Sequence, residues 1–244
     1  VTCGQWGGNT WYYMEGSGAM LTGWQEIGGI RYYLDGSGAM RTGWVWIGNE
    51  CYYFDGSGAM AKDTWIGDYY VDENGVWVQG MVKPGWILSG GRWWYRHSDG
   101  GYTTSGWEYI GGSWYYFDAS GWMVTGWQLV DGTWYYLNGS GAMHTGWLLL
   151  GNTWYYLESD GKMAVGLTEV GGRMYYLDGS GAMHRGWVLL GHSWYYFDGS
   201  GAMYTGWLWY GNAWYYLLED GKMAVGSHEI DGVMYEFATD GRMI

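Results

Sequence analysis

Residue types that mark several common classes of protein are scarce in this chain of 244 residues. It has two cysteines, Cys3 and Cys51, a single proline, and 11 lysine and arginine residues against 24 aspartate and glutamate residues. Two cysteines allow one disulfide in a secreted protein but do not make a disulfide framework. The basic residues form no cluster, which excludes a surface that follows the phosphates of a nucleic acid. No apolar run reaches the roughly 18 residues of a membrane helix, so we expect no membrane span.

Residues suited to catalysis or metal binding are few, and they recur at loop positions. The histidines belong to no metal-binding motif, and His144 and His184 follow the same loop in different repeats. The aspartates that recur at one turn position are Asp35, Asp55, Asp118, Asp178 and Asp198. A short carboxylate at that place favours a turn over acid–base chemistry. We therefore expect no catalytic residue, no cofactor and no metal site.

Glycine and aromatic residues are abundant instead, with 48 glycines and 21% aromatic residues. Tryptophans recur at multiples of twenty residues in two positions. The first position holds Trp107, Trp127, Trp147, Trp187 and Trp207, and the second holds Trp114, Trp134, Trp154, Trp194 and Trp214. A fixed period of this length is typical of stacked supersecondary units, each presenting the same arrangement of aromatic rings.

Each repeat has the pattern of a β-hairpin followed by a loop, as residues 125–144 illustrate. Asp131-Gly132 separates two short strand-like stretches and is a strong signal for a tight hairpin turn. The second stretch, Trp-Tyr-Tyr-Leu over 134–137, suits a pleated surface, and the glycine-rich loop after it permits a positive φ. No helical period occurs, so we expect an all-β fold with almost no helix. Because a lone hairpin is marginally stable in water, the hairpins must stack.

The regularity of the repeat divides the chain into three segments. Residues 1–61 form N-terminal, partly degenerate hairpin repeats, in which Arg31 and Cys51 stand at the second tryptophan position. We interpret Cys51 as a small apolar substitute. Residues 62–104 form irregular repeats and a candidate bend, and residues 105–244 form regular repeats of twenty residues.

The tryptophan pair has two interpretations. Aromatic side chains could serve packing alone. Alternatively, two indoles from one repeat, closed by a tyrosine from the next, form a three-walled box that suits a quaternary ammonium group. Both tryptophans are lost together at Leu167 and Met174, and again at Ser227 and Met234, although the hairpin signals persist. This paired loss indicates that the tryptophans serve something separable from the fold.

The pattern GWxxxxxxWYYL/F followed by DGSGAM resembles the choline-binding repeats, or cell-wall-binding repeats, of Gram-positive surface proteins, their lytic enzymes and their phages. The resemblance implies a left-handed β-solenoid of stacked β-hairpins with about three hairpins per turn. It also implies sites between consecutive repeats that hold choline or phosphocholine of teichoic or lipoteichoic acid. The expected location is extracellular, at the bacterial cell wall surface.

The resemblance implies a set of choline-binding residues, in which each box combines a tryptophan pair with the second tyrosine of the next repeat. The second tyrosine is chosen because strand alternation places Tyr136 on the same face as Trp134. The boxes are Trp86 and Trp93 with Tyr116, Trp107 and Trp114 with Tyr136, Trp127 and Trp134 with Tyr156, Trp147 and Trp154 with Tyr176, Trp187 and Trp194 with Tyr216, and Trp207 and Trp214 with Tyr235, since Glu236 takes the matching place in the last. The methionines that would add an apolar wall are Met143, Met163, Met183 and Met203. Arg31 places a cation where a cation should bind, so no working site is expected there.

The sequence thus predicts a non-catalytic choline-binding module of a surface or secreted protein. Two alternatives stay open, a glucan- or glycan-binding module and an adhesin scaffold that binds a host protein. The chain starts at Val1 without a signal peptide, so we interpret it as a mature protein or a piece of a longer one. A catalytic domain could have been attached outside it.

Overall fold

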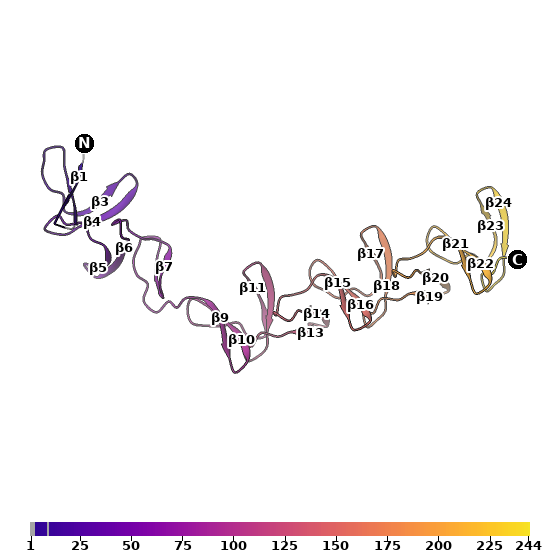
Figure 1. Cartoon of the computed structure of the whole chain (residues 1–244). Coiled ribbons are helices and arrows are strands. Elements are labelled where there is room, and N and C mark those ends of the chain that lie inside the picture. Colours follow the sequence, from indigo (N-terminus) through magenta and orange to yellow (C-terminus); the bar gives the residue numbers. More distant parts are fainter. Residues whose placement is uncertain (1–2, 9) are drawn as a thin grey trace. The chain divides into compact units, whose positions relative to one another are not determined.

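The computed structural model describes residues 3–8 and 10–244. Within these residues the chain is all-β, and its strands pair in sequence order into two-stranded sheets, each a hairpin (Figure 1). No helix there is long and apolar enough to cross a membrane. The predicted segment 1–61 includes residues 1, 2 and 9, which lie outside the described residues. The expectation of repeated hairpins and almost no helix is confirmed.

Contacts group the hairpins into two compact units. The first comprises the chain up to Gly106 together with Phe117–Met123, and the second comprises Trp107–Tyr116 and Val124–Ile244. The strands up to residue 96 are β1 (Cys3–Gly7), β2 (Thr10–Met14), β3 (Gly23–Ile27), β4 (Ile30–Leu34), β5 (Gly43–Ile47), β6 (Glu50–Phe54), β7 (Thr64–Ile66), β8 (Tyr69–Val71), β9 (Gly85–Ser89) and β10 (Arg92–Arg96). The strands that follow are β11 (Gly106–Ile110), β12 (Ser113–Phe117), β13 (Gly126–Val130), β14 (Thr133–Leu137), β15 (Gly146–Leu150), β16 (Thr153–Leu157), β17 (Gly166–Val170), β18 (Arg173–Leu177), β19 (Gly186–Leu190), β20 (Ser193–Phe197), β21 (Gly206–Tyr210), β22 (Ala213–Leu217), β23 (Gly226–Ile230) and β24 (Val233–Phe237).

The shortest strands, β7 and β8, lie in the segment predicted to be irregular. The division into 1–61, 62–104 and 105–244 is not tested by the two units and stays a prediction.

The hairpin β13–β14 forms at the turn that its sequence predicts. Asp131 and Gly132 adopt φ values of 50° and 78°, as the two central residues of a type I′ turn require. The resulting register places Trp127 opposite Tyr136 and Leu129 opposite Trp134.

The buried core is a row to which most hairpins contribute one residue, the last of the second strand. These side chains are almost fully buried, and they are Leu34, Phe54, Val71, Phe117, Leu137, Leu157, Leu177, Phe197 and Leu217. The tryptophans of the second strand are much more exposed; Trp134, for example, keeps 42% of its accessible surface. Packing therefore depends chiefly on the leucine or phenylalanine, and the indoles remain available at the surface.

The loop after each hairpin folds around the side chain of its first residue. In the loop 178–183, Asp178 Oδ1 accepts hydrogen bonds from the backbone N–H groups of Ser180 (2.8 Å) and Ala182 (3.1 Å) and from the Ser180 hydroxyl. Asn138 accepts the equivalent bonds in its own loop. The recurring aspartates therefore stabilise turns, as predicted.

Most loops also join their hairpin to the one before it. The backbone N–H of Met143 donates to the Trp114 carbonyl at 2.8 Å, and the same bond links Met163 to Trp134. The methionine then lies beneath the loop of the following repeat, because a Cβ added at Gly161 would lie 2.3 Å from Met143 Sδ. Gly161 is required both for its positive φ of 83° and for this close approach.

Cys51 is a free, buried thiol.

The contact between Gly161 and Met143 can be separated from the effect of backbone conformation. Gly166 has a φ of 84°, close to the 83° of Gly161, but nothing lies within 4 Å of a Cβ added there. We expect Gly166→Ala to lower the free energy of unfolding by about 1–2 kcal/mol, because alanine is strained in the left-handed conformation. Gly161→Ala should cost about 1–3 kcal/mol more, because it displaces Met143. Urea unfolding followed by circular dichroism measures both. Adding Met143→Ala should bring the loss of unfolding free energy caused by Gly161→Ala closer to that caused by Gly166→Ala. Equal losses for the two single variants would contradict the packing argument.

The loop carboxylate makes stability depend on pH. The hydrogen bond from Ser180, opposed by partial burial and aided by His184, lowers the pKa of Asp178 to about 2. A lowered pKa means that the stabilisation is present above the ordinary value near 4 and is lost as the pH falls through about 2. Asp178→Asn should keep the loop, as Asn138 does, and should remove this dependence. Urea midpoints at pH 5, 4, 3 and 2 should show the gap between wild type and variant shrinking toward pH 2, and a constant gap would refute this assignment.

Candidate functional site

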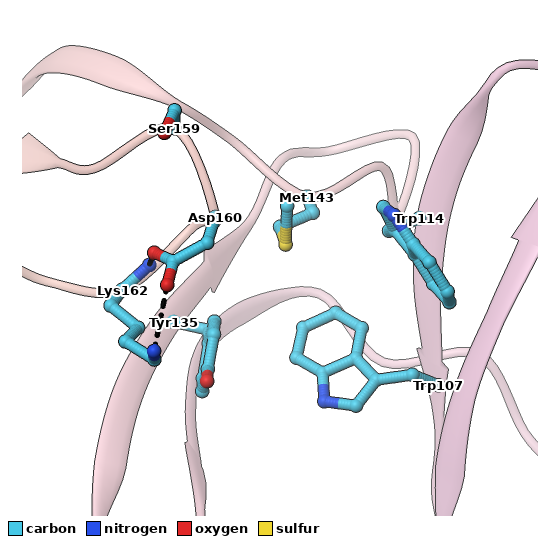
Figure 2. Close-up of a pocket in the computed structure, with 7 residues that line it drawn as sticks. All are labelled: Trp107, Trp114, Tyr135, Met143, Ser159, Asp160 and Lys162. Atoms are coloured by element: carbon cyan, nitrogen blue, oxygen red, sulfur yellow. Dashed lines mark hydrogen bonds and ion pairs between the residues drawn. The ribbon is translucent and has the colours of Figure 1, made fainter.

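A cavity in the second unit is built from three consecutive repeats (Figure 2). Trp107 and Trp114 come from the hairpin β11–β12, Tyr135 from β14 and Met143 from the loop after β14. The rim is completed by the loop after β16, which contributes Ser159, Asp160 and Lys162. The cavity has a volume of about 420 Å³. We call this arrangement of a tryptophan pair, a tyrosine and a methionine an aromatic box.

The rings of the box stand at steep angles to one another. Trp107 lies 4.9 Å from Tyr135 with an interplanar angle of 66°. Tyr116 of the same hairpin contacts Trp107 at 5.1 Å and 69°. Trp114, 44% exposed, lines another side of the cavity. Ring faces carry negative electrostatic potential, so rings turned toward one centre from several sides attract a cation placed among them.

The charged groups on the rim neutralise each other. Lys162 Nζ lies 2.7 Å from Asp160 Oδ2, and Figure 2 shows this pair beside Tyr135. Their mutual hydrogen bond raises the pKa of Lys162 and lowers the pKa of Asp160. Because their charges are opposite, the pair adds little net charge to the box, and both side chains are about half exposed.

The structure corrects the choice of closing tyrosine by one residue. Tyr135, not the predicted Tyr136, lies against Trp107, whereas Tyr136 packs at 5.2 Å on Trp127 of its own hairpin. Alternation along the strand correctly separates the two tyrosines into opposite faces. It does not show which face meets the preceding hairpin. In the structure, that hairpin is met by the face that carries Tyr135 and the core residue Leu137.

The same shift applies along the second unit. The observed contacts join Trp127 to Tyr155 at 5.1 Å, Trp147 to Tyr175 at 4.8 Å, and Trp187 to Tyr215 at 5.1 Å. The predicted Tyr156 and Tyr216 instead contact Trp147 and Trp207 of their own hairpins. Tyr176, predicted for the Trp147 box, lies against His184 and Phe197.

The last box has the predicted tyrosine. Tyr235 lies 4.8 Å from Trp207. Trp207 and Trp214, 6.2 Å apart, line a cavity of about 200 Å³ together with Met243. Tyr235 occupies the first-tyrosine position, which is why it agrees with the other observed contacts.

In the remaining predicted boxes, the structure brings different numbers of the predicted residues together. Trp147 and Trp154 share a cavity of about 230 Å³ with Tyr175, Met183 and Ser200.

Trp127 and Trp134 lie 6.4 Å apart at 87°. In the first unit Trp86 contacts Tyr95 and stacks on Phe117. The predicted closing residue Tyr116 belongs to the second unit, so the box of Trp86 and Trp93 stays a prediction.

Hairpins persist where the tryptophan pair is lost. Glu169 pairs with Met174 in β17–β18, and Glu229 pairs with Met234 in β23–β24, in the register that Leu129 and Trp134 show. The tryptophans are therefore dispensable for the hairpin itself.

Arg31 covers the aromatic face that its hairpin would otherwise present. Its guanidinium carbon lies 4.7 Å from the ring centroid of Trp24. Tyr52 of the next hairpin lies 4.8 Å from the same indole, and burial, with a hydrogen bond to Glu50, raises the pKa of Tyr52 to about 12.

Two sets of residues were not anticipated from the sequence. The first is the rim of Ser159, Asp160 and Lys162, which a comparison of loop sequences could have found, because six other loops have Gly-Ser-Gly-Ala there. The second is an aromatic pocket in the first unit around Trp44 and Trp77. Within residues 3–8 and 10–244, histidine, cysteine and acidic side chains form no group of three that could hold a metal ion.

Comparisons with known proteins agree with this geometry. The model of a choline-binding repeat matches residues 21–65, 104–147 and 184–228, and the model of a cell wall binding repeat matches residues 5–20 and 145–163. No curated protein sequence matches the chain.

Solved structures of Streptococcus pneumoniae proteins are similar over the whole chain. CbpJ from strain TIGR4 is 31% identical, with both chains covered in full and a TM-score of 0.61. Choline-binding protein F, crystallised in the presence of a peptidoglycan analogue, is 30% identical over 100% of this chain and 98% of its own, with a TM-score of 0.62. The chain belongs to the choline-binding repeat family.

Proposed function

We propose that this chain is a non-catalytic module that attaches a secreted or surface protein to the bacterial cell wall by binding choline. The ligand is phosphocholine carried on teichoic or lipoteichoic acid. The observation that carries the proposal is the recurring aromatic box, in which two indoles of one hairpin meet the first tyrosine of the next. Membership of the choline-binding repeat family supports the ligand.

The proposed ligand residues are the tryptophan pairs with the tyrosines that lie against them. These are Trp107 and Trp114 with Tyr135, Trp127 and Trp134 with Tyr155, Trp147 and Trp154 with Tyr175, Trp187 and Trp194 with Tyr215, and Trp207 and Trp214 with Tyr235. The trimethylammonium group enters each box, and the methionine provides an apolar wall. The phosphate remains at the open rim.

The geometry favours a rounded cation over a sugar ring. Interplanar angles between the first tryptophan and the closing tyrosine lie between 60° and 71° in these boxes. A sugar stacks on a flat aromatic platform, whereas rings that meet at steep angles form a concave corner. The net charge of −13 also favours a cationic ligand.

Affinity should arise from many weak sites. Each cation–π contact contributes about 0.5–2 kcal/mol. Three contacts, less the cost of ordering the ligand, give about −4 kcal/mol, or roughly millimolar affinity per box. A polymer that carries choline at regular intervals can occupy several boxes at once, and this multivalency raises the apparent affinity by orders of magnitude.

A solenoid arrangement would present these boxes regularly. We infer a left-handed β-solenoid with about three hairpins per turn. In support, β17–β18 and β23–β24, three hairpins apart in the second unit, extend in the same direction in Figure 1. The loop-to-hairpin bonds between neighbours, such as Met143 N–H to the Trp114 carbonyl, provide the linkage along such a stack.

Binding can be tested on a tertiary-amine ion-exchange resin that mimics choline. We expect the protein to stay bound in high salt and to elute with free choline in the millimolar range, because the boxes recognise the alkylated ammonium and not charge alone. Glucan should not compete. Elution by salt without any response to choline would rule out the proposal.

The corrected tyrosine register gives a second test. The triple variant Tyr135→Leu, Tyr155→Leu, Tyr175→Leu removes one of three aromatic walls from three boxes. We expect choline affinity at each of these boxes to fall about 2- to 30-fold, the loss of one cation–π contact, as measured by choline titration of tryptophan fluorescence. The matched control is Tyr136→Leu, Tyr156→Leu, Tyr176→Leu, which should weaken binding less. The reverse order would favour the original tyrosine assignment.

A further inference from the structure

A differently built aromatic pocket lies in the first unit, where the repeat has lost its second tryptophan. Trp44 and Trp46 come from β5, Cys51 from β6, Tyr69 from β8, and Trp77 from the loop after β8. Together they line a cavity of about 270 Å³. The tryptophan-pair pattern does not identify it, because Cys51 stands where the second tryptophan would be.

Trp77 occupies the position that methionine holds in the regular repeats. Its backbone N–H donates to the Cys51 carbonyl at 2.7 Å, as Met143 donates to Trp114. It bridges to Val71 as Met143 bridges to Leu137. An indole therefore replaces a thioether at this wall, and it restores the aromatic surface that Cys51 removes.

The other walls also follow the architecture of the boxes. Tyr69 precedes Tyr70, which pairs with Trp65, so Tyr69 has the register of a closing tyrosine. It lies 5.7 Å from Trp44 at 81° and 5.8 Å from Trp77 at 84°. Trp46, 60% exposed, lies 6.3 Å from Trp77 at 79°. Trp44 and Trp77 meet at 64°, so four rings surround one cavity at steep angles to one another.

The preceding hairpin shows that a cation fits at this place in the repeat. Arg31 pairs with Glu26 in β3–β4, in the register in which Cys51 pairs with Trp46 in β5–β6. The Arg31 guanidinium lies over Trp24 at 4.7 Å. Cys51 is too short to reach its own ring faces in this way, and burial raises the pKa of its thiol, which keeps the wall uncharged. The residues that line the cavity include no lysine, arginine or histidine.

We propose that the pocket formed by Trp44, Trp46, Tyr69 and Trp77 binds a quaternary ammonium group, in addition to the boxes built on tryptophan pairs. The choice of choline as the probe rests on the proposed function of those boxes. The concave arrangement of four rings and the absence of a competing cationic side chain among the lining residues favour this class of ligand over a sugar or an anion.

Cys51 provides a local readout of this pocket. In a Cys3→Ser background, the protein is treated with 2-(trimethylammonium)ethyl methanethiosulfonate or with neutral methyl methanethiosulfonate. The Cys51 sulfur attacks the sulfenyl sulfur and expels methanesulfinate, and intact-mass spectrometry follows the mixed disulfide. Relative to their rates with a free thiol, we expect the cationic reagent to react at least tenfold faster than the neutral one. Choline at tens of millimolar should slow both at least tenfold.

Two variants test whether the protection of Cys51 by choline arises at this pocket. Trp77→Met restores the usual wall residue and should reduce protection by choline several-fold. Trp154→Ala alters a box in the second unit and should leave protection of Cys51 unchanged. If choline that elutes the protein from the amine resin does not slow labelling of Cys51, this proposal is wrong while the proposed function stands. Failure of choline to elute the protein is a separate result and concerns the boxes of the second unit.

If Cys51 reacts with neither reagent, a crystal of the full chain soaked in choline provides an independent test of the proposal. Density for choline among the four rings supports the proposal. Filled boxes in the second unit beside an empty pocket at Trp77 overturn it. In Cys51→Arg the guanidinium should lie over the rings, as in the preceding hairpin, and should exclude choline from this pocket alone.

Discussion

The hydrogen bond from each loop to the preceding hairpin is the interaction on which the rest of the structure depends. A two-stranded hairpin buries too little surface to be stable alone. The bond from Met143 N–H to the Trp114 carbonyl, and its equivalents along the chain, attach most hairpins to their predecessors. They also bring the tyrosine of one hairpin to the tryptophan of the one before. Stacking and the formation of the aromatic boxes therefore have the same cause.

The residues that hold the stack differ from those that line the boxes. The stack depends on the buried leucine or phenylalanine at the end of most second strands and on glycines that allow one loop to lie over a methionine. The tryptophans remain partly exposed and can be lost, as at Leu167 and Met174, without loss of the hairpin. Such a chain can vary its binding surface repeat by repeat. The pocket at Trp77 and the arginine-covered face at Trp24 are two outcomes of that variation.

Much of the local structure could be predicted from the sequence because it depends on interactions within a few residues. The Asp131-Gly132 turn, the strand of Trp134 to Leu137 and the loop around Asp178 all formed as expected. The closing tyrosine could not be chosen in this way. Alternation places Tyr135 and Tyr136 on opposite faces, and only the docking of the next hairpin decides which face meets Trp107.

The twenty-residue period by itself determined an all-β chain of hairpins, the loop aspartates as turn residues and the tryptophan pairs as the candidate ligand surface, since each follows from spacing along the chain. The tertiary structure decided which side chains complete each box. Trp77 became a wall for Trp44 because a loop hydrogen bond carries it across to Cys51 of the neighbouring hairpin. A contact between hairpins depends on where each face is held in space, and a periodic sequence does not specify that position.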